Sequence, residues 1–157
     1  MTTKHGACGV VVSQGSILLM YREKEVKKYY VFPGGGIEEG EAPEEAVVRE
    51  FAEETNITVK PIRPIYYINY DDNTDRVYFL CDYISGTPKL QKNTNEFERM
   101  QTEEGQYYEP KWLPLARLNE TIVFPLQIRD LVIEDIKNSF NQEPKRLSIV
   151  RAIERQV

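Results

Sequence analysis

The sequence has few residues of the kinds that build covalent or zinc-based frameworks. It contains two cysteines and one histidine among 157 residues. Cys8 and Cys81 lie apart in apolar, strand-like stretches, and two isolated cysteines form neither a disulfide framework nor a zinc site. We therefore predict two buried free thiols in a protein of the reducing cytoplasm. No serine triad can be assembled either, and His5 is expected to have a structural role or to be disordered.

Long hydrophobic runs and an excess of positive charge are also absent. No stretch approaches the roughly 20 apolar residues of a membrane-spanning helix. The apolar segment at residues 7–12 is too short for an export signal and has no cleavage site after it. The formal net charge is -5, which disfavours partners such as nucleic acid or an anionic membrane surface. A small phosphate ligand remains compatible, because a metal ion can supply the positive charge.

The length and composition are those of one compact domain, which we expect to span residues 1–157. Apolar and turn-forming residues predict strands at 6–13, 16–22, 29–33, 57–70, 76–85 and 107–115. Helices are predicted at 43–55 and about 125–140. Loops are predicted at 23–28, 34–41 and 86–106, and residues 141–157 are expected to fray or to form a short helix. This order predicts an α+β fold with a mixed sheet flanked by helices.

Three glutamates are predicted to lie on one face of the helix at 43–55. Glu50, Glu53 and Glu54 are separated by three and four residues, which brings their side chains together. Carboxylates gathered in this way repel one another, and a hard divalent cation such as Mg²⁺ relieves the repulsion. On spacing alone, a solvated acidic face is the favoured interpretation, because glutamate-rich helix faces are common. The preceding glycines at 34–36 favour a metal site, because their backbone can approach a ligand and expose carbonyl oxygens.

The segment from Gly34 to Ile57 resembles the signature of the Nudix hydrolases. That signature is a glycine, five residues, Glu, seven residues, Arg-Glu, an aliphatic residue, any residue, Glu-Glu, any residue, Gly and an aliphatic residue. The matching positions are Gly35, Glu41, Arg49, Glu50, Glu53, Glu54 and Ile57. Phe51 replaces an aliphatic residue. Asn56 replaces the glycine after the helix, and we predict a left-handed backbone there, which Asn tolerates best after Gly.

The resemblance implies an α/β/α sandwich that hydrolyses a diphosphate linkage in a nucleoside diphosphate joined to another moiety. It implies Mg²⁺ or Mn²⁺ as cofactor, held by Glu50, Glu53, Glu54 and a carbonyl of the glycine loop, taken as that of Gly35. A carboxylate must take the proton of the attacking water, and Glu53 and Glu50 are the candidates for this general base.

The resemblance also implies features around that centre. Some family members use a glutamate of a later loop as the base, and Glu103 and Glu104 are candidates here, with a solvated acidic loop as the alternative. Arg49 and Glu41 are expected to form a structural ion pair between loop and helix. A homodimer is common in the family and is therefore possible for this chain.

The rest of the substrate must be bound by residues outside the motif. Arg22 is a candidate for a phosphate contact, with a surface salt bridge as the alternative. Aromatic side chains are candidates for stacking, although core positions are their more common role: Tyr29, Tyr30, Tyr66, Tyr67, Tyr107, Tyr108 and Trp112. Oxidised nucleoside triphosphates, ADP-ribose, nucleotide sugars, dinucleoside polyphosphates and RNA ends all remain possible substrates. The alternative function is a catalytically silent domain that binds a nucleotide, which the complete set of motif glutamates disfavours.

Overall fold

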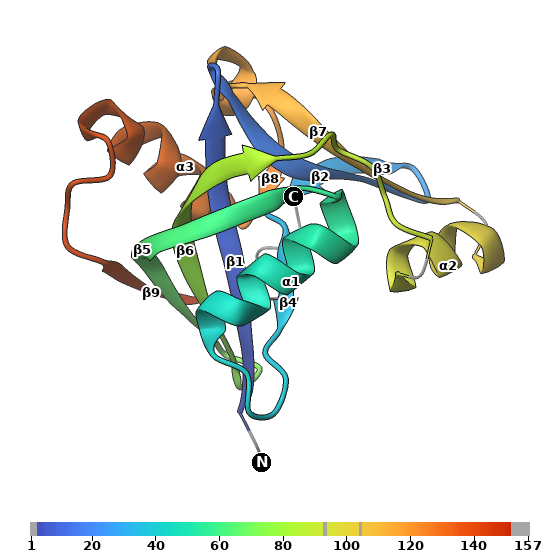
Figure 1. The fold of residues 1–157 in the computed structure, drawn as a ribbon, viewed down its shortest axis with the longest axis horizontal. Coiled ribbons are helices and arrows are strands. Elements are labelled where there is room, and N and C mark those ends of the chain that lie inside the picture. Colours follow the sequence, from blue (N-terminus) through green and yellow to red (C-terminus); the bar gives the residue numbers. More distant parts are fainter. Residues whose placement is uncertain (1–2, 93, 104, 152–157) are drawn as a thin grey trace.

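The computed structural model describes residues 3–92, 94–103 and 105–151, and its core is one mixed sheet (Figure 1). The strands are β1 Lys4–Ser13, β2 Ser16–Lys24, β3 Lys27–Val31, β4 Gly34–Gly36, β5 Thr58–Tyr70, β6 Thr74–Ser85, β7 Gln106–Pro114, β8 Val123–Phe124 and β9 Lys145–Ile149. The helices are α1 Pro43–Thr55, α2 Asn95–Thr102 and α3 Leu126–Asp135, with 3₁₀ turns at Leu115–Glu120 and Ile136–Asn138.

The strand β1 joins two halves of the curled sheet. The strand order is β8-β3-β2-β1-β6-β5-β9, with β4 added to β1 and β7 added to β2. From Lys4 to Val11, β1 pairs in parallel with β6, whereas Val12 and Ser13 pair antiparallel with β2. Because β1 changes partner along its length, the two halves diverge at its N-terminal end, where β4 and α1 are placed.

Helices cover both faces of this sheet. In Figure 1, α1 crosses in front of β1, and α3 lies on the other side. The helix α1 packs Val47 and Phe51 against Val11 and Leu18, in one apolar cluster. On the opposite face, α3 packs Ile128 and Val132 into a second and larger cluster. These layers confirm the predicted mixed sheet flanked by helices.

The helix that carries the three glutamates forms where the sequence predicts it. Pro43 occupies the first turn, where its missing N–H costs nothing, and Glu44 and Glu45 add negative charge at the positive end of the helix dipole. Asn56 ends the helix with φ 62° and ψ 22°, and its N–H bonds to the carbonyl of Ala52. The predicted left-handed residue is therefore confirmed.

Five predicted segments differ from the structure. Residues 23–28 are mostly strand, because the hairpin between β2 and β3 turns at only two residues, Glu25 and Val26. The glycines at 34–36 form β4, since pairing with β1 uses backbone groups alone. The predicted loop at 86–106 contains α2, and the segment after residue 141 contains β9, parallel to β5. The predicted helix at 125–140 ends earlier, at Asp135.

The start of β5, which contains two prolines, lies at an edge of the sheet. Pro61 and Pro64 lie in the part of β5 that pairs only with β6, because β9 joins β5 from Tyr66 onward. A proline in this position removes no ladder hydrogen bond on the open side.

The predicted buried free thiols are confirmed at Cys8 and Cys81.

Candidate active site

The strand β4 lies directly against the glutamate helix. An added Cβ at Gly35 would stand 2.5 Å from Oε1 of Glu50, so the carboxylate of Glu50 would have to move away. The glycine therefore lets the backbone of β4 approach the carboxylate of Glu50 closely. By contrast, a Cβ at the next residue, Gly36, would meet no atom within 4 Å.

The three glutamates of α1 differ in burial. Glu54 is 8% exposed and accepts a hydrogen bond from the N–H of Gly34 at 3.4 Å. The side chain of Glu50 is 13% exposed and that of Glu53 is 48% exposed. Burial raises the pKa of Glu54 well above its ordinary value, and the nearby carboxylates of Glu96 and Glu50 raise it further. The cluster therefore contains a carboxylate whose charge is unfavourable in the protein alone.

Arg49 connects the glycine strand, the loop and the helix. Its Nε and Nη2 donate to the two carboxylate oxygens of Glu41 at 2.8 and 3.0 Å, which confirms the predicted ion pair. It also donates to the carbonyl of Gly36 at 3.0 Å and to Glu50 and Glu53 at 3.0 and 3.3 Å. Hydrogen bonds from Arg49 and from the backbone lower the pKa of Glu41 to about 2.

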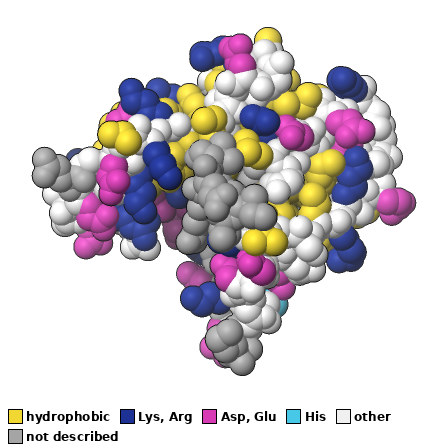
Figure 2. Space-filling model, turned by 180° about the vertical axis from the view of Figure 1, so that it is seen from behind, with side chains coloured by type: hydrophobic (Ala, Val, Ile, Leu, Met, Phe, Trp, Pro, Cys, Tyr) yellow, Lys and Arg dark blue, Asp and Glu magenta, His cyan; other side chains and the backbone are white. Residues whose placement is uncertain are grey.

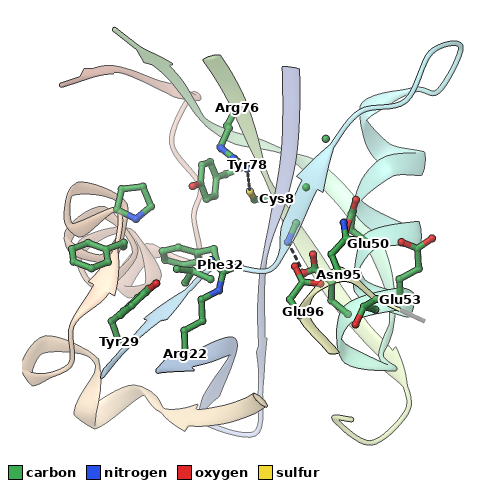
Figure 3. Close-up of a pocket in the computed structure, with 18 of the residues that line it drawn as sticks. Cys8, Arg22, Tyr29, Phe32, Glu50, Glu53, Arg76, Tyr78, Asn95 and Glu96 are labelled. Carbon is green, nitrogen blue, oxygen red and sulfur yellow. Dashed lines mark hydrogen bonds between the residues drawn. The ribbon is translucent and has the colours of Figure 1, made fainter. Parts of the chain in front are cut away.

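The glycines of β4, Arg49 and the three glutamates of α1 line a cleft with a volume of about 930 Å³. This volume is near the upper end of the roughly 300–1,000 Å³ typical of small-ligand sites. Glu50, Glu53 and Glu96 lie on one side of the cleft, and Arg22 and Tyr29 lie on the other (Figure 3). The cleft is therefore wide enough for a nucleotide-sized ligand between its acidic and aromatic walls.

Sequence reasoning missed Glu96, which lies in the first turn of α2 and lines the cleft. The helix has no buried residue, so no apolar periodicity reveals it. The sequence does contain a signal for the start of this helix. Thr94 is its N-cap and accepts a hydrogen bond from the N–H of Phe97, and acidic residues follow in the first turn. Glu103, at the end of α2, is exposed and is not among the residues that line the cleft; Glu104 lies outside the described residues.

The donor groups fit a hard divalent cation in their chemistry. Within residues 3–92, 94–103 and 105–151, no three acidic, histidine or cysteine side chains are gathered into a complete ligand set. The acidic wall nevertheless offers carboxylate oxygens, the ligands that Mg²⁺ and Mn²⁺ prefer. The buried carboxylate of Glu54, repelled by Glu50 and Glu96, would be stabilised by a cation there.

Two of the predicted recognition residues lie in the cleft. The Nε of Arg22 is buried and has no hydrogen-bond partner among the described residues, while its guanidinium lies 5.3 Å from the centre of the Tyr108 ring. Tyr29 lines the cleft beside Phe124, with ring centres 5.4 Å apart. Phe124, which the sequence did not indicate, thus extends the aromatic wall.

The other predicted aromatic candidates are not among the residues that line the cleft: Tyr30, Tyr66, Tyr67, Tyr107, Tyr108 and Trp112. Tyr66 is fully buried and donates a hydrogen bond to Asp135, so it belongs to the core. His5 has the structural role expected of it, because its Nδ1 lies 2.7 Å from Asp75.

The family model described as the NUDIX domain matches residues 3–129. This match covers most of the sequence, and the chain belongs to the Nudix family. A crystal structure of a NUDIX hydrolase from Nitrosomonas europaea superimposes with a TM-score of 0.72 at 15% identity, covering 96% of this chain and 81% of that chain. An ADP-ribose pyrophosphatase structure from Streptococcus suis gives a TM-score of 0.65 at 16% identity, over 93% of this chain and 99% of that chain. Both likenesses show the α/β/α sandwich fold.

Two curated relatives are similar in sequence over shorter stretches. An ADP-ribose pyrophosphatase from Methanocaldococcus jannaschii is 33% identical over 96 residues, which is 57% of this chain and 57% of that protein. An RNA pyrophosphohydrolase from Actinobacillus succinogenes is 34% identical over 58 residues, 37% of this chain and 29% of that protein. The matched part thus spans little more than half of the first relative and less than a third of the second.

Proposed function

We propose that this protein hydrolyses a diphosphate linkage in a nucleoside diphosphate joined to another moiety, with Mg²⁺ or Mn²⁺ as cofactor. The observation that carries the proposal is the acidic wall of the cleft. Glu54 is buried there beside Glu50 and Glu96, and Gly35 has no Cβ that would push Glu50 away. Burying like charges together costs free energy in the protein alone, so a fold that keeps them supports a bound cation.

The residues that would hold the metal are Glu50, Glu53, Glu54 and the carbonyl of Gly35. When bound, the metal would neutralise the diphosphate and lower the pKa of a water molecule. Glu53 is the most exposed of the three carboxylates, which suits it to accept a proton from water, and Glu50 is the second candidate for that base.

Glu96 joins Glu103 and Glu104 as a glutamate from outside the motif that is a candidate for the base or for the metal. It lines the cleft from α2, and its carboxylate raises the pKa of Glu54. The repulsion between Glu96 and Glu54 supports Glu96 as the strongest of these three candidates.

The opposite wall supports recognition of the nucleotide. The guanidinium of Arg22, with a buried Nε that has no described partner, is suited to bind a phosphate oxygen. The rings of Tyr29 and Phe124 offer a surface for a base or a sugar. The similarity to an ADP-ribose pyrophosphatase supports a small nucleotide as substrate, and the net charge of -5 makes a long RNA the least favoured.

A panel of diphosphate-linked nucleotides, assayed with Mg²⁺ or Mn²⁺ for released phosphorylated products, tests the proposal. Glu53→Gln should lower kcat at least about 10²-fold, the scale of losing a general base or a metal-bound charge. Glu44→Gln is the matched control, because Glu44 lies on the same helix, is exposed and does not line the cleft. Near-native kcat in the Glu53 variant would refute its assignment. Binding of a nucleotide without turnover by the wild type would favour the silent binding domain instead.

Three further expectations belong to the same proposal. The single domain of residues 1–157, the cytoplasmic location and the possible homodimer stay predictions, and sedimentation of the purified protein tests the last. No helix of the described chain is long and apolar enough to cross a membrane.

On the face seen in Figure 2, Lys and Arg side chains lie beside Asp and Glu in several places, which agrees with a small ligand rather than a polyanion as partner.

A further inference from the structure

Arg76 is a half-buried cation without an acidic partner in the described chain. It lies on β6 and lines the cleft next to Cys8 and Tyr78, across from Glu50 and Glu53 (Figure 3). Its described hydrogen bond goes to the sulfur of Cys8 at 3.7 Å, and no described carboxylate forms a salt bridge with it. A guanidinium has five N–H donors, and thiol sulfur is a weak acceptor. Among the described residues, most of the hydrogen-bonding capacity of Arg76 is thus unused.

A second guanidinium lines the same cleft from beyond β9. The guanidinium carbon of Arg151 lies 3.5 Å from the centre of the Tyr70 ring. Its backbone N–H is bonded to Asp71 and its Nε to Asp72 at 3.1 Å, which fixes its position. Within the described residues, no hydrogen bond uses its two terminal nitrogens. Arg151 stacks on the ring of Tyr70, and Tyr70 lines the same cleft as both arginines.

These two residues make the cleft electrostatically asymmetric. One wall carries Glu50, Glu53, Glu54 and Glu96, whereas the other region carries Arg76, which has no described acidic partner, and Arg151, which is paired with Asp72. Removing a cation such as Arg76 from water is costly unless an anion or good hydrogen bonds compensate it. The match to the family model ends at residue 129, so Arg151 comes from the part of the chain that follows it.

We propose that Arg76 and Arg151 bind a phosphate monoester that the substrate carries away from its scissile diphosphate. Arg76 brings a positive charge with no described acidic partner, and Arg151, which forms a salt bridge with Asp72, brings two terminal nitrogens that no described hydrogen bond uses. A phosphate monoester, with three terminal oxygens and a charge of about −1.5 to −2 at pH 7, offers acceptors for both groups, whereas a carboxylate offers two oxygens and a single charge. Guanidinium donors also fit phosphate oxygens in a bidentate way. The substrate preference rests on the proposed function, whereas the binding of phosphate by this pair does not.

The first experiment measures binding of inorganic phosphate to the full chain in EDTA, by isothermal titration, so that no metal contributes. We expect Arg76→Gln and Arg151→Gln each to weaken phosphate binding about tenfold, the effect of losing one charge-assisted hydrogen-bonding group. Arg117→Gln is the matched control, since Arg117 is exposed, pairs with Glu120 and does not line the cleft. Native affinity in the first two variants, or an equal loss in the control, would overturn the proposal.

Because Arg76 is partly buried, a melting curve checks that the Arg76→Gln variant is folded. Arg151→Gln provides a second, independent test of the same site.

The second experiment compares two dinucleotides that differ by one 2′-phosphate, with Mg²⁺ present. We expect Arg151→Gln to raise KM about tenfold for the phosphorylated dinucleotide, with kcat unchanged and the unphosphorylated one unaffected. Equal effects on both dinucleotides would refute the preference. Lack of turnover of either by the wild type, with phosphate binding intact, would refute the proposed function for dinucleotides and leave the site standing.

Discussion

Replacing Glu54 with glutamine should stabilise the metal-free protein, although the residue belongs to the proposed metal site. Burial raises the pKa of Glu54 above its ordinary value of 4.5, and the carboxylates of Glu96 and Glu50 act in the same direction. The folded state therefore binds a proton that the unfolded state releases as the pH rises above 4.5. Stability contributed by the protonated form is present at low pH and is lost as the pH rises through the folded pKa. Glutamine imitates the neutral form at every pH.

The size of this effect follows from the burial of the side chain. Glu54 is 8% exposed, and its described hydrogen bond is the one from the N–H of Gly34, which a glutamine oxygen can also accept. An incompletely compensated buried polar group costs about 1–3 kcal/mol. A relief of about 2 kcal/mol corresponds to a rise in Tm of about 4–8 °C in a domain of this size.

Thermal melts in EDTA between pH 4 and pH 8 measure this difference directly. The variant should melt above the wild type near pH 7.5, and the two curves should converge toward pH 4. Glu53→Gln is the control, because its side chain is 48% exposed and should change Tm little. Millimolar Mg²⁺ should raise the Tm of the wild type more than that of the Glu54 variant, by mass action on the folded state. A variant less stable than the wild type at pH 7.5, or a difference independent of pH, would contradict this reasoning.

Other substitutions test the backbone and the ion pair around the site. Asn56→Val should lower the free energy of unfolding by about 1–2 kcal/mol in urea melts, because a β-branched residue resists φ 62°, whereas Asn56→Gly should change it by less than about 1 kcal/mol. Gly35→Ala should displace the carboxylate of Glu50 and weaken Mg²⁺ binding in titrations, while Gly36→Ala, which has open space around its Cβ, should bind Mg²⁺ as the wild type does. Glu41→Gln should lower Tm at neutral pH. The pKa of Glu41 is lowered to about 2, so its contribution is complete above 4.5 and disappears as the pH falls toward 2; a loss that is the same at pH 3 and pH 7 would count against the ion pair.

Much of α1 and its surroundings follows from local signals in the sequence. Pro43 marks its start, the spacing of Glu50, Glu53 and Glu54 defines its polar side, and Asn56 permits the left-handed turn that ends it. The pairing of Arg49 with Glu41 came from the family signature and is present. Each of these features depends on residues close in the chain, which is why one sequence suffices to predict them.

The remaining site depends on pairings between distant segments. Nothing in three consecutive glycines indicates that Gly35 pairs with Ala7, because β4 forms through its backbone alone. Glu96 reaches the cleft on a helix without a buried face, and Arg151 reaches it because β9 pairs with a strand almost eighty residues earlier. The tyrosines illustrate the same limit, since alternation in a strand does not tell which face of a curled sheet borders the core at Tyr66 and which borders the cleft at Tyr29.

Arg49 has a consequence for the valence of the ion that the proposed metal site would take. Its guanidinium already bonds Glu50 and Glu53 and is anchored by Glu41 and the carbonyl of Gly36. A cation that arrives from solution must therefore take these oxygens from a tethered competitor, so that binding is an exchange of one counter-ion for another. A monovalent ion brings no more charge than the group it displaces, whereas a divalent ion brings twice as much. In the proposed site, discrimination against sodium and potassium would thus come from one of the protein's own side chains.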